Sequence, residues 1–345
     1  MIPIQNIYYM LSYAFQVLNE QGYKNIATEQ FNNTGELMAA ILEKGIAIQL
    51  KRGLGKEYIP QTEALSSLRG KIDIAESIKT QSMLRKQLIC TYDEFSVNSI
   101  MNRIIKSTVE LLLRSNISKQ RKKNLRKLMV YFSEVDFIDS YTVNWNVQYN
   151  RNNQTYRMLI SICYLVVKGL LQTQSNGHTK LMDFLDEQRM CRLYEKFILE
   201  YYRKEFKNQF TANASQIPWQ LDNEENSMLP VMQSDIMLQS GEKVLIIDAK
   251  YYEHSTQVQF DKHTLHSGNL YQIFTYVKNK EYELREKDHT VSGMLLYAKT
   301  DEEIYPNNVY QMSGNQITVR TLDLNLPFDE IAGQLNTIAK THFDL

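Results

Sequence analysis

One hairpin-like stretch, residues 229–252, constrains the fold of this chain more than any other segment. Two apolar, strand-like runs lie in it: the first carries Asp235, and the second ends in Asp248, Ala249 and Lys250. A carboxylate and an ammonium at the end of a buried strand are unfavourable unless they are paired, hydrogen-bonded or bound to a metal. The stretch therefore predicts a buried hairpin with charged chemistry at one end.

Strand geometry brings the charged residues together. Because side chains alternate along a strand, Asp248 and Lys250 share one face and Ala249 takes the other. A two-residue loop at Ser240-Gly241 puts Asp235 diagonal to Asp248, with Cα atoms roughly 7–8 Å apart. A four-residue loop, 240–243, puts the two carboxylates directly opposite each other. Both loops gather the two carboxylates and the lysine on one face, whereas a three-residue loop does not.

Two carboxylates that converge beside a lysine suit a hard cation such as Mg²⁺, which prefers oxygen ligands. Such a cation polarises a phosphoryl oxygen and activates water. Lys250 would orient the attacking water and offset the charge on a scissile phosphate. The same residues are also compatible with a surface hairpin that is held by a salt bridge.

Several segments resemble one known family in the same order along the chain. Asp235 followed by Asp248-Ala249-Lys250 resembles the D…(D/E)xK motif of restriction-type nucleases. The whole chain resembles McrC proteins, the nuclease subunits of McrBC restriction systems. The segments that carry this resemblance are IPIQNIYYMLSYAF, LRGKID, FSVNSIMNRIIKST, MLP…SDI…VLIIDAKYY and HSGNLYQIFTY.

The resemblance implies a mixed α+β fold with two domains. An N-terminal domain of helices and strands, residues 1–150, would bind and stimulate a GTPase partner. A C-terminal α/β domain of the PD-(D/E)xK restriction-endonuclease type, residues 151–345, would follow the polar segment 150–154. In that superfamily the backbone carbonyl at the position of Ala249 often adds a ligand to the metal held by Asp235 and Asp248.

The implied function is that of a Mg²⁺-dependent DNA endonuclease subunit in a restriction system directed at methylcytosine. The partners would be a McrB-type AAA+ GTPase hexamer and double-stranded methylated DNA. GTP would be bound by the partner, because this chain has no G-xxxx-GK[ST] motif.

Three further residues are implied to support the site. Glu195, on an expected helix at 187–206, would assist the metal directly or through water. Gln272 and Tyr276 are four apart, so they share a helix face; in RecB-like nucleases a Q-xxx-Y helix of this kind contributes to DNA positioning. From the residues alone, all three are equally compatible with ordinary helix positions.

Basic residues in the N-terminal half have two interpretations. By resemblance, Arg69 and Lys71 are candidates for the contact with the GTPase partner; from the residues alone they lie on a solvated edge hairpin. The basic run that follows Ser118, residues 119–127, would either touch DNA phosphates or form a solvated helix face.

Composition narrows the class of protein. Lysines and arginines equal aspartates and glutamates at 39 each, so no global field draws the chain to nucleic acid. The three cysteines, an odd number with wide spacing, indicate neither a disulfide framework nor a zinc site. The N-terminus does not resemble a signal peptide, and the apolar run 159–167 is too short to span a bilayer. These features predict a cytoplasmic protein without a membrane partner.

Two other functions remain as alternatives. A stand-alone RecB-like repair nuclease is disfavoured by the N-terminal half and the neutral charge. A non-catalytic activator of a motor is disfavoured by the intact Asp235, Asp248 and Lys250.

Hydrophobic periodicity predicts the remaining elements. Ser96 or Asn98 is expected to cap the helix that begins near residue 100, and Ser267 or Asn269 to start the helix within 263–278. Other expected helices cover 4–18, 34–50, 156–171 and 328–339, and expected strands cover 58–60, 68–73, 90–95, 291–298, 309–312 and 316–319.

Overall fold

A computed structural model of the protein describes residues 2–15, 18, 23, 26, 29, 31, 33–139, 142–150, 153–175, 187–222, 228–252, 257–259, 262–299 and 305–345. The chain divides into two compact units. Unit 1 comprises Met1–Glu20 and Leu185–Leu345, and unit 2 comprises Gln21–Phe184. In sequence, unit 2 is therefore an insertion within unit 1.

This division differs from the boundary expected near residue 150, because helix α7 (Tyr156–Ser175) packs with the helices that precede it. The buried Tyr156 hydroxyl donates to Asn102 Oδ1 at 2.7 Å and accepts from Gly55 N at 2.7 Å. A buried hydroxyl needs such partners. The residues on both sides of the expected boundary therefore belong to unit 2.

The first helix, α1 (Ile4–Ala14), belongs to unit 1 although unit 2 follows it in the sequence. The Asn6 side chain donates to the carbonyls of Leu324 at 2.7 Å and Leu326 at 2.8 Å. The Tyr9 ring stacks on Phe328 with 4.4 Å between centroids. These contacts join the start of the chain to its C-terminal part.

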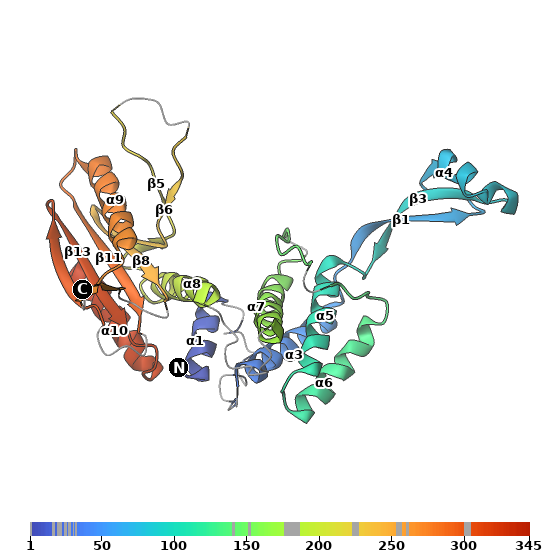
Figure 1. Ribbon diagram of the computed structural model, residues 1–345, viewed down its shortest axis with the longest axis horizontal. Coiled ribbons are helices and arrows are strands. Elements are labelled where there is room, and N and C mark those ends of the chain that lie inside the picture. The colour runs from blue at the N-terminus through green and yellow to red at the C-terminus, as the bar shows by residue number, and fades with distance from the viewer. Residues whose placement is uncertain are drawn as a thin grey trace. The chain divides into compact units, whose positions relative to one another are not determined.

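Unit 2 is built mainly on helices. The helices are α3 (Thr34–Arg52), α5 (Ile100–Arg114), α6 (Lys119–Met129) and α7, with α3 against α6 and α7 (Figure 1). Ser118 caps α6, as expected. The expected cap of α5 was wrong: Ser99, with extended backbone, accepts from Asn102 N, whereas Ser96 Oγ accepts from Asn98 N.

A three-stranded antiparallel sheet, here called the arm, projects from the helices of unit 2 (Figure 1). Its strand order is β1 (Glu57–Leu65), β3 (Leu88–Ser96), β2 (Lys71–Asp73), with helix α4 (Ile74–Lys79) and the 3₁₀ turn η3 (Ser82–Arg85) inserted between β2 and β3. Both strands expected at 58–73 form, but each pairs with β3 and not with the other. A Cβ at Gly70, where φ is +70°, would lie 2.3 Å from Thr91 O, so only glycine fits there.

Unit 1 contains a six-stranded mixed sheet of order β12-β13-β11-β8-β7-β4. β7 and β8 form the central antiparallel hairpin, while β8, β11 and β13 run parallel to one another. The bounds are β4 (Thr211–Asn213), β7 (Ile236–Ser240), β8 (Lys243–Lys250), β11 (Thr290–Ala298), β12 (Asn308–Met312) and β13 (Asn315–Leu322). This mixed architecture confirms the predicted α+β fold class.

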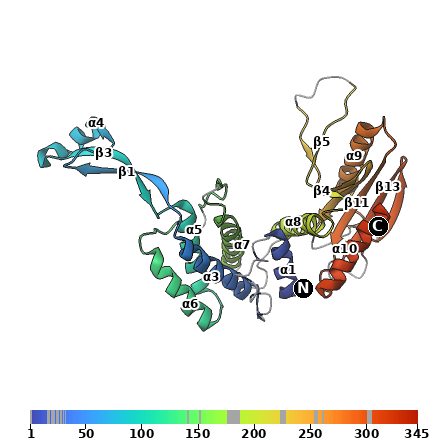
Figure 2. The ribbon, with the colours of Figure 1, turned by 180° about the vertical axis from the view of Figure 1, so that it is seen from behind.

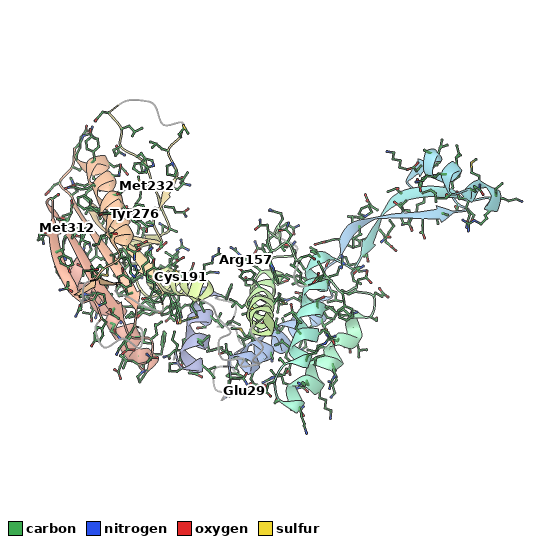
Figure 3. The ribbon with its side chains drawn as sticks, in the orientation of Figure 1. Glu29, Arg157, Cys191, Met232, Tyr276 and Met312 are labelled. Atoms are coloured by element: carbon green, nitrogen blue, oxygen red, sulfur yellow. The ribbon has the colours of Figure 1, made fainter. Side chains whose placement is uncertain are left out.

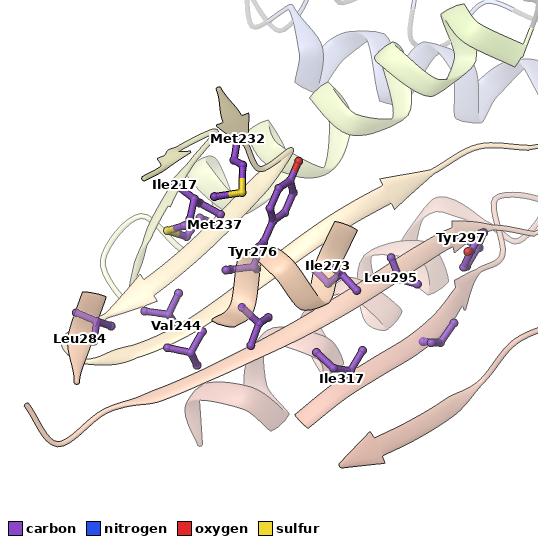
Figure 4. Close-up of a cluster of buried hydrophobic side chains, with 14 residues drawn as sticks. Ile217, Met232, Met237, Val244, Ile273, Tyr276, Leu284, Leu295, Tyr297 and Ile317 are labelled. Carbon is purple, nitrogen blue, oxygen red and sulfur yellow. The ribbon is translucent and has the colours of Figure 1, made fainter. Parts of the chain in front are cut away.

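Helices cover both faces of the sheet. Helix α9 (Ser267–Leu284) packs on the face that carries Val244, Ile246 and Ile317 (Figure 4). Helix α10 (Phe328–Phe343) meets Leu296 and Leu322 on the opposite face (Figure 2). Helix α8 (Glu187–Glu205) joins α10 there, since the Tyr202 hydroxyl donates to Leu335 O at 3.0 Å. Burial on both faces explains the almost unbroken apolar runs of β8 and β11.

Short paired strands complete unit 1. They are β5 (Gln216–Ile217) with β6 (Met232–Gln233), and β9 (Gln257–Gln259) with β10 (Lys262–Thr264). The hairpin expected around Ser313-Gly314 forms, with φ of +50° and +92° at these two residues. Within the described ranges, none of the helices is long and apolar enough to cross a membrane.

An ion cluster ties α6 to the rest of unit 2. The Arg121 side chain, 12% exposed, pairs with Glu29, with Glu36 at 3.3 Å and with Glu43 at 2.9 Å. Glu36 also accepts from the backbone and side chain of Ser118, both at 2.8 Å. Removing one partner of a buried ion pair is costly because the remaining charge stays desolvated.

We therefore expect Arg121→Ala to lower the free energy of unfolding of unit 2 by about 3 kcal/mol, since the glutamates keep their burial and lose their counter-charge. Arg126→Ala, an exposed position on the same helix, should change it by less than about 0.5 kcal/mol. The measurement is urea unfolding, monitored by tryptophan fluorescence. The chain has two tryptophans, so replacing Trp219 with Phe leaves Trp145 of unit 2 as the reporter. Equal effects of both substitutions would contradict the structural role of the cluster.

Candidate active site

The register of the central hairpin sets the geometry of the site. Ser240 pairs with Lys243 and Ile236 with Ile247, so the turn is Gly241-Glu242, with φ of +58° at the glycine. The same register continued by one residue places Asp235 opposite Asp248. Of the two arrangements that the sequence allowed, this is the one in which the carboxylates face each other directly. The turn that gives it has two residues, whereas a four-residue loop was expected from the sequence for this register.

Asp235 lies just before β7 and is anchored to β8. Its Oδ2 accepts from Ala249 N at 2.9 Å, which holds the carboxylate beside the end of the neighbouring strand. Ala249 itself is fully buried on the other face of the sheet. The hairpin therefore positions Asp235 through a backbone contact that does not depend on a particular side chain at position 249.

Asp248 is the most strongly desolvated charge of the site, at 1% exposed. Lys250 Nζ lies 2.8 Å from its Oδ2, yet neither carboxylate oxygen has a well-aligned hydrogen bond within the described part of the chain. Burial raises the pKa of Asp248, Lys250 lowers it and Asp235 raises it again, so that the pKa ends above its usual value. Such a carboxylate is stabilised by a cation.

Helix α9 supplies the next contacts. Lys250 Nζ donates to Gln272 Oε1 at 3.3 Å, and Gln272 Nε2 donates to the Tyr276 hydroxyl at 2.9 Å. Tyr276 lies in the core cluster between α9 and the sheet, where Figure 4 shows its ring near Met232. The structure thus joins both Q-xxx-Y residues to the lysine in one hydrogen-bonded chain.

The charges of the hairpin shift the pKa of Glu195, which lies on α8. Burial raises its pKa, Asp235 raises it further, and Lys250 lowers it. Cys191, one turn earlier on α8 and labelled in Figure 3, donates its thiol to Glu195 Oε1 at 3.0 Å. Burial and the neighbouring carboxylate raise the pKa of Cys191 to about 12, so the thiol is protonated. Sequence reasoning missed this partner of Glu195.

A second missed group fixes the start of α9. Asn269, which is buried, donates to the Tyr297 hydroxyl at 2.9 Å and accepts from the Tyr252 hydroxyl at 3.3 Å. Tyr297 is the register partner of Lys250 on β11. One signal in the sequence could have indicated this group: Lys250 and Tyr252 are two residues apart, the spacing of one strand face. From the sequence, Asn269 was expected only as a possible helix start. These contacts place α9 beside the end of β8.

The net negative charge of the candidate ligands is suited to binding a divalent cation. Asp235, Asp248 and Glu195 contribute three carboxylates, against the single ammonium of Lys250. The two buried oxygens of Asp248 are without aligned hydrogen bonds, as described above. Among the described residues, no group of three His, Cys, Asp or Glu side chains is already arranged as a complete metal site. Two carboxylates with a backbone carbonyl and water is a ligand set that Mg²⁺ accepts.

The two candidate residues for a partner contact lie outside this site. Arg69 and Lys71 are exposed on the arm of unit 2. The Arg69 guanidinium stacks over the Tyr92 ring, 4.0 Å from its centroid, and Lys71 is the register partner of Thr91 on β3.

Comparison of the sequence with known proteins identifies a family and a relative. The family model described as McrBC 5-methylcytosine restriction system component matches residues 5–298. The Type IV methyl-directed restriction enzyme EcoKMcrBC of Escherichia coli (strain K12) is 31% identical over 331 residues, covering 94% of this chain and 93% of the relative.

Two solved structures give looser matches. A half-complex from the tetradecameric assembly of Thermococcus gammatolerans McrB AAA+ hexamers with bound McrC has a TM-score of 0.48 at 18% identity, over 97% of this chain and 76% of the other. The Thermococcus gammatolerans McrBC complex has a TM-score of 0.42 at 20% identity, over 59% of each chain. Both TM-scores lie below 0.5, so family membership follows from the sequence matches alone.

The closeness of α9 to the sheet depends on Gly293 of β11. A Cβ there would lie 2.8 Å from side-chain atoms of Ile273 and Ile317 and 2.9 Å from Val277. The helix that carries Gln272 can therefore approach the sheet only over a residue without a side chain.

We expect Gly293→Ala to lower the free energy of unfolding of unit 1 by about 1–3 kcal/mol, because the added methyl overpacks the core beneath α9. Gly333→Ala is the control: its Cβ meets nothing within 4 Å on α10, so helix propensity should make the change neutral or stabilising. Urea unfolding with Trp145 replaced by Phe, followed through Trp219, measures both. A neutral Gly293→Ala would show that α9 has room to move.

Proposed function

Because this chain belongs to the McrBC family of 5-methylcytosine restriction system components, we propose that it is the DNA endonuclease subunit of such a system. The observation that carries the proposal is the convergence of Asp235, Asp248 and Lys250 at the end of one hairpin. A desolvated carboxylate, Asp248, with a second carboxylate and a lysine beside it at the end of the buried strand β8, has a high cost unless it serves a cation and a charged substrate.

The carboxylates would hold the cation. Asp235 and Asp248 would each contribute an oxygen, and the backbone carbonyl of Ala249 a third. A divalent ion such as Mg²⁺, when bound, supplies Lewis acidity at the scissile phosphodiester and eases ionisation of the attacking water. Glu195, whose pKa is shifted by the charges of Asp235 and Lys250, would bind the ion through water or accept a proton.

Lys250 would act on the phosphate and the water. Its ammonium lies on the same strand face as Asp248 and would offset the negative charge that develops on the phosphodiester. Gln272 accepts from the same ammonium and is itself held by Tyr276. We propose that these two hydrogen bonds fix the direction of the Lys250 side chain. Gln272 and Tyr276 would then support catalysis by positioning the lysine.

The partner would be a GTPase ring of the McrB type. The absence of a G-xxxx-GK[ST] motif from the sequence means that this chain lacks the phosphate-binding loop of P-loop GTPases. The E. coli relative is described as a methyl-directed restriction enzyme, which supports methylated DNA as the target of the assembly. The arm of unit 2, with Arg69 and Lys71 exposed, is our candidate for the contact that stimulates GTP hydrolysis.

Asp235→Asn and Asp248→Asn are each expected to abolish DNA cleavage by the chain assembled with its partner, GTP and Mg²⁺, because an amide is a much weaker ligand for a hard cation. Partner binding and GTPase stimulation should persist. Asp344→Asn is the control, because this carboxylate is exposed and pairs with Lys243 at the turn end of β8. The readout is cleavage of a methylated plasmid beside Mg²⁺ titration calorimetry. Ordinary cleavage by either site variant would refute the assignment.

Lys250→Met is expected to slow cleavage by about 10²–10³, the usual loss when one charge-assisted contact to the transition state is removed. Methionine keeps the apolar stem, and GTPase stimulation should be retained. Lys287→Met, at a lysine whose side chain is 64% exposed, is the matched control and should cleave normally. A single-turnover cleavage assay and a GTPase assay on one preparation measure both activities. If they fall in parallel, Lys250 supports the fold or the assembly, and its role in cleavage must be withdrawn.

A further inference from the structure

Helix α6 concentrates positive charge on one face. The helix carries basic residues along its length and no acidic residue in its sequence KQRKKNLRKLM. Leu125 is its buried anchor, and Arg121 turns inward to the glutamates of unit 2. The residues that remain exposed form what we call the basic stripe: Lys119, Lys123, Arg126 and Lys127.

The stripe is one continuous surface. Its members are spaced i, i+4, i+7 and i+8, the spacing that places residues on a single helix face. At 1.5 Å rise per residue, the stripe is about 12 Å long, a length over which one strand of duplex DNA carries about three to four phosphates. The number of cations therefore matches the number of phosphates that one strand of a duplex offers over this length.

The stripe has no internal counter-charge in the part of the chain that the structure describes. No ion pair joins any of its four members to a carboxylate there. Like charges at i, i+4, here Lys119 with Lys123 and Lys123 with Lys127, destabilise a helix. A bound polyanion would remove this repulsion.

The exposed cation Arg69 on the arm is arranged differently. Its guanidinium lies over the ring of Tyr92, whose hydroxyl donates to Glu63. The charge of Glu94 also raises the pKa of Tyr92. The arm thus mixes both signs of charge. Because the whole chain has a net charge of zero, the stripe is a local concentration that composition hides.

We propose that the basic stripe of α6 binds the phosphate backbone of double-stranded DNA without sequence preference, as a DNA contact on unit 2 outside the candidate active site. The choice of DNA among polyanions rests on the proposed nuclease function. Lysine and arginine side chains on a helix face bind phosphates as point charges and release counterions, which makes the affinity depend on salt.

The test compares two double variants in the full-length Asp248→Asn chain, which should bind DNA without cutting it. Lys123→Gln with Arg126→Gln removes two charges from the stripe. Lys51→Gln with Arg52→Gln removes two exposed charges from the end of α3 in the same unit. Fluorescence anisotropy of a short labelled, unmethylated duplex gives Kd from roughly 50 to 200 mM salt.

The stripe variant is expected to weaken DNA binding and to reduce the slope of log Kd against log salt by about 1.8, from about 0.9 per lost phosphate contact. The α3 variant should keep the parent slope. An unchanged slope in the stripe variant would overturn the proposal, leaving a solvated helix face. Unchanged DNA binding with reduced stimulation of the GTPase would overturn it too, in favour of an acidic surface on the partner.

The outcome is separable from that of the proposed function. Binding is measured in a background that lacks Asp248, so it does not require a working active site. Cleavage by the unaltered chain tests the hairpin residues instead. If the stripe variant has a smaller slope of log Kd against log salt but the unaltered chain, assembled with its partner, does not cleave DNA, only the nuclease assignment is refuted. If the assembled unaltered chain cleaves DNA but the slope is unchanged in the stripe variant, only the stripe proposal is refuted.

Discussion

The strongest physical constraint on unit 1 is a desolvated carboxylate, Asp248, held 2.8 Å from the ammonium of Lys250 at the end of a buried strand. A pair of this kind seldom stabilises a fold, because the cost of removing both charges from water offsets their attraction. Apolar residues would serve the sheet better at these positions. The site is therefore best understood as a cost to stability that the surrounding sheet has to support.

That support comes from contacts that are mostly apolar or made by the backbone. Ala249 N holds Asp235, and β11 lies in parallel register alongside β8, with Tyr297 beside Lys250. Gly293 lets α9 approach closely, and Asn269 fixes the start of that helix between two tyrosine hydroxyls. A rigid frame of this kind is what allows a small charged group to keep one geometry.

Unit 2 has a separate set of constraints, although it is inserted in the sequence of unit 1. Its charges are sorted by burial: Arg121 is enclosed by glutamates, while the cations of the basic stripe remain exposed on the other side of the same helix. One helix thus serves both as an internal brace and as an outward charged surface. Neither role can be seen in a net charge of zero.

Local patterns in the sequence determined most elements and their chemistry. Short continuous apolar runs identified the strands β8 and β11, and apolar residues at helical spacing identified the helices α3 and α9. The grouping of Asp235, Asp248 and Lys250 followed from the alternation of side chains along a strand. The resemblance to McrC proteins added Glu195, Gln272 and Tyr276, and the structure places these residues around the hairpin.

Only the tertiary structure decided which segments meet. It chose the facing register of the two carboxylates, paired the arm strands through β3, and put Ser99 at the start of α5. It also assigned α1 to unit 1 and α7 to unit 2, whereas a boundary near residue 150 would have exchanged them. Such choices depend on contacts between residues far apart in sequence, as between Asn6 and Leu324, and these leave no local pattern to read.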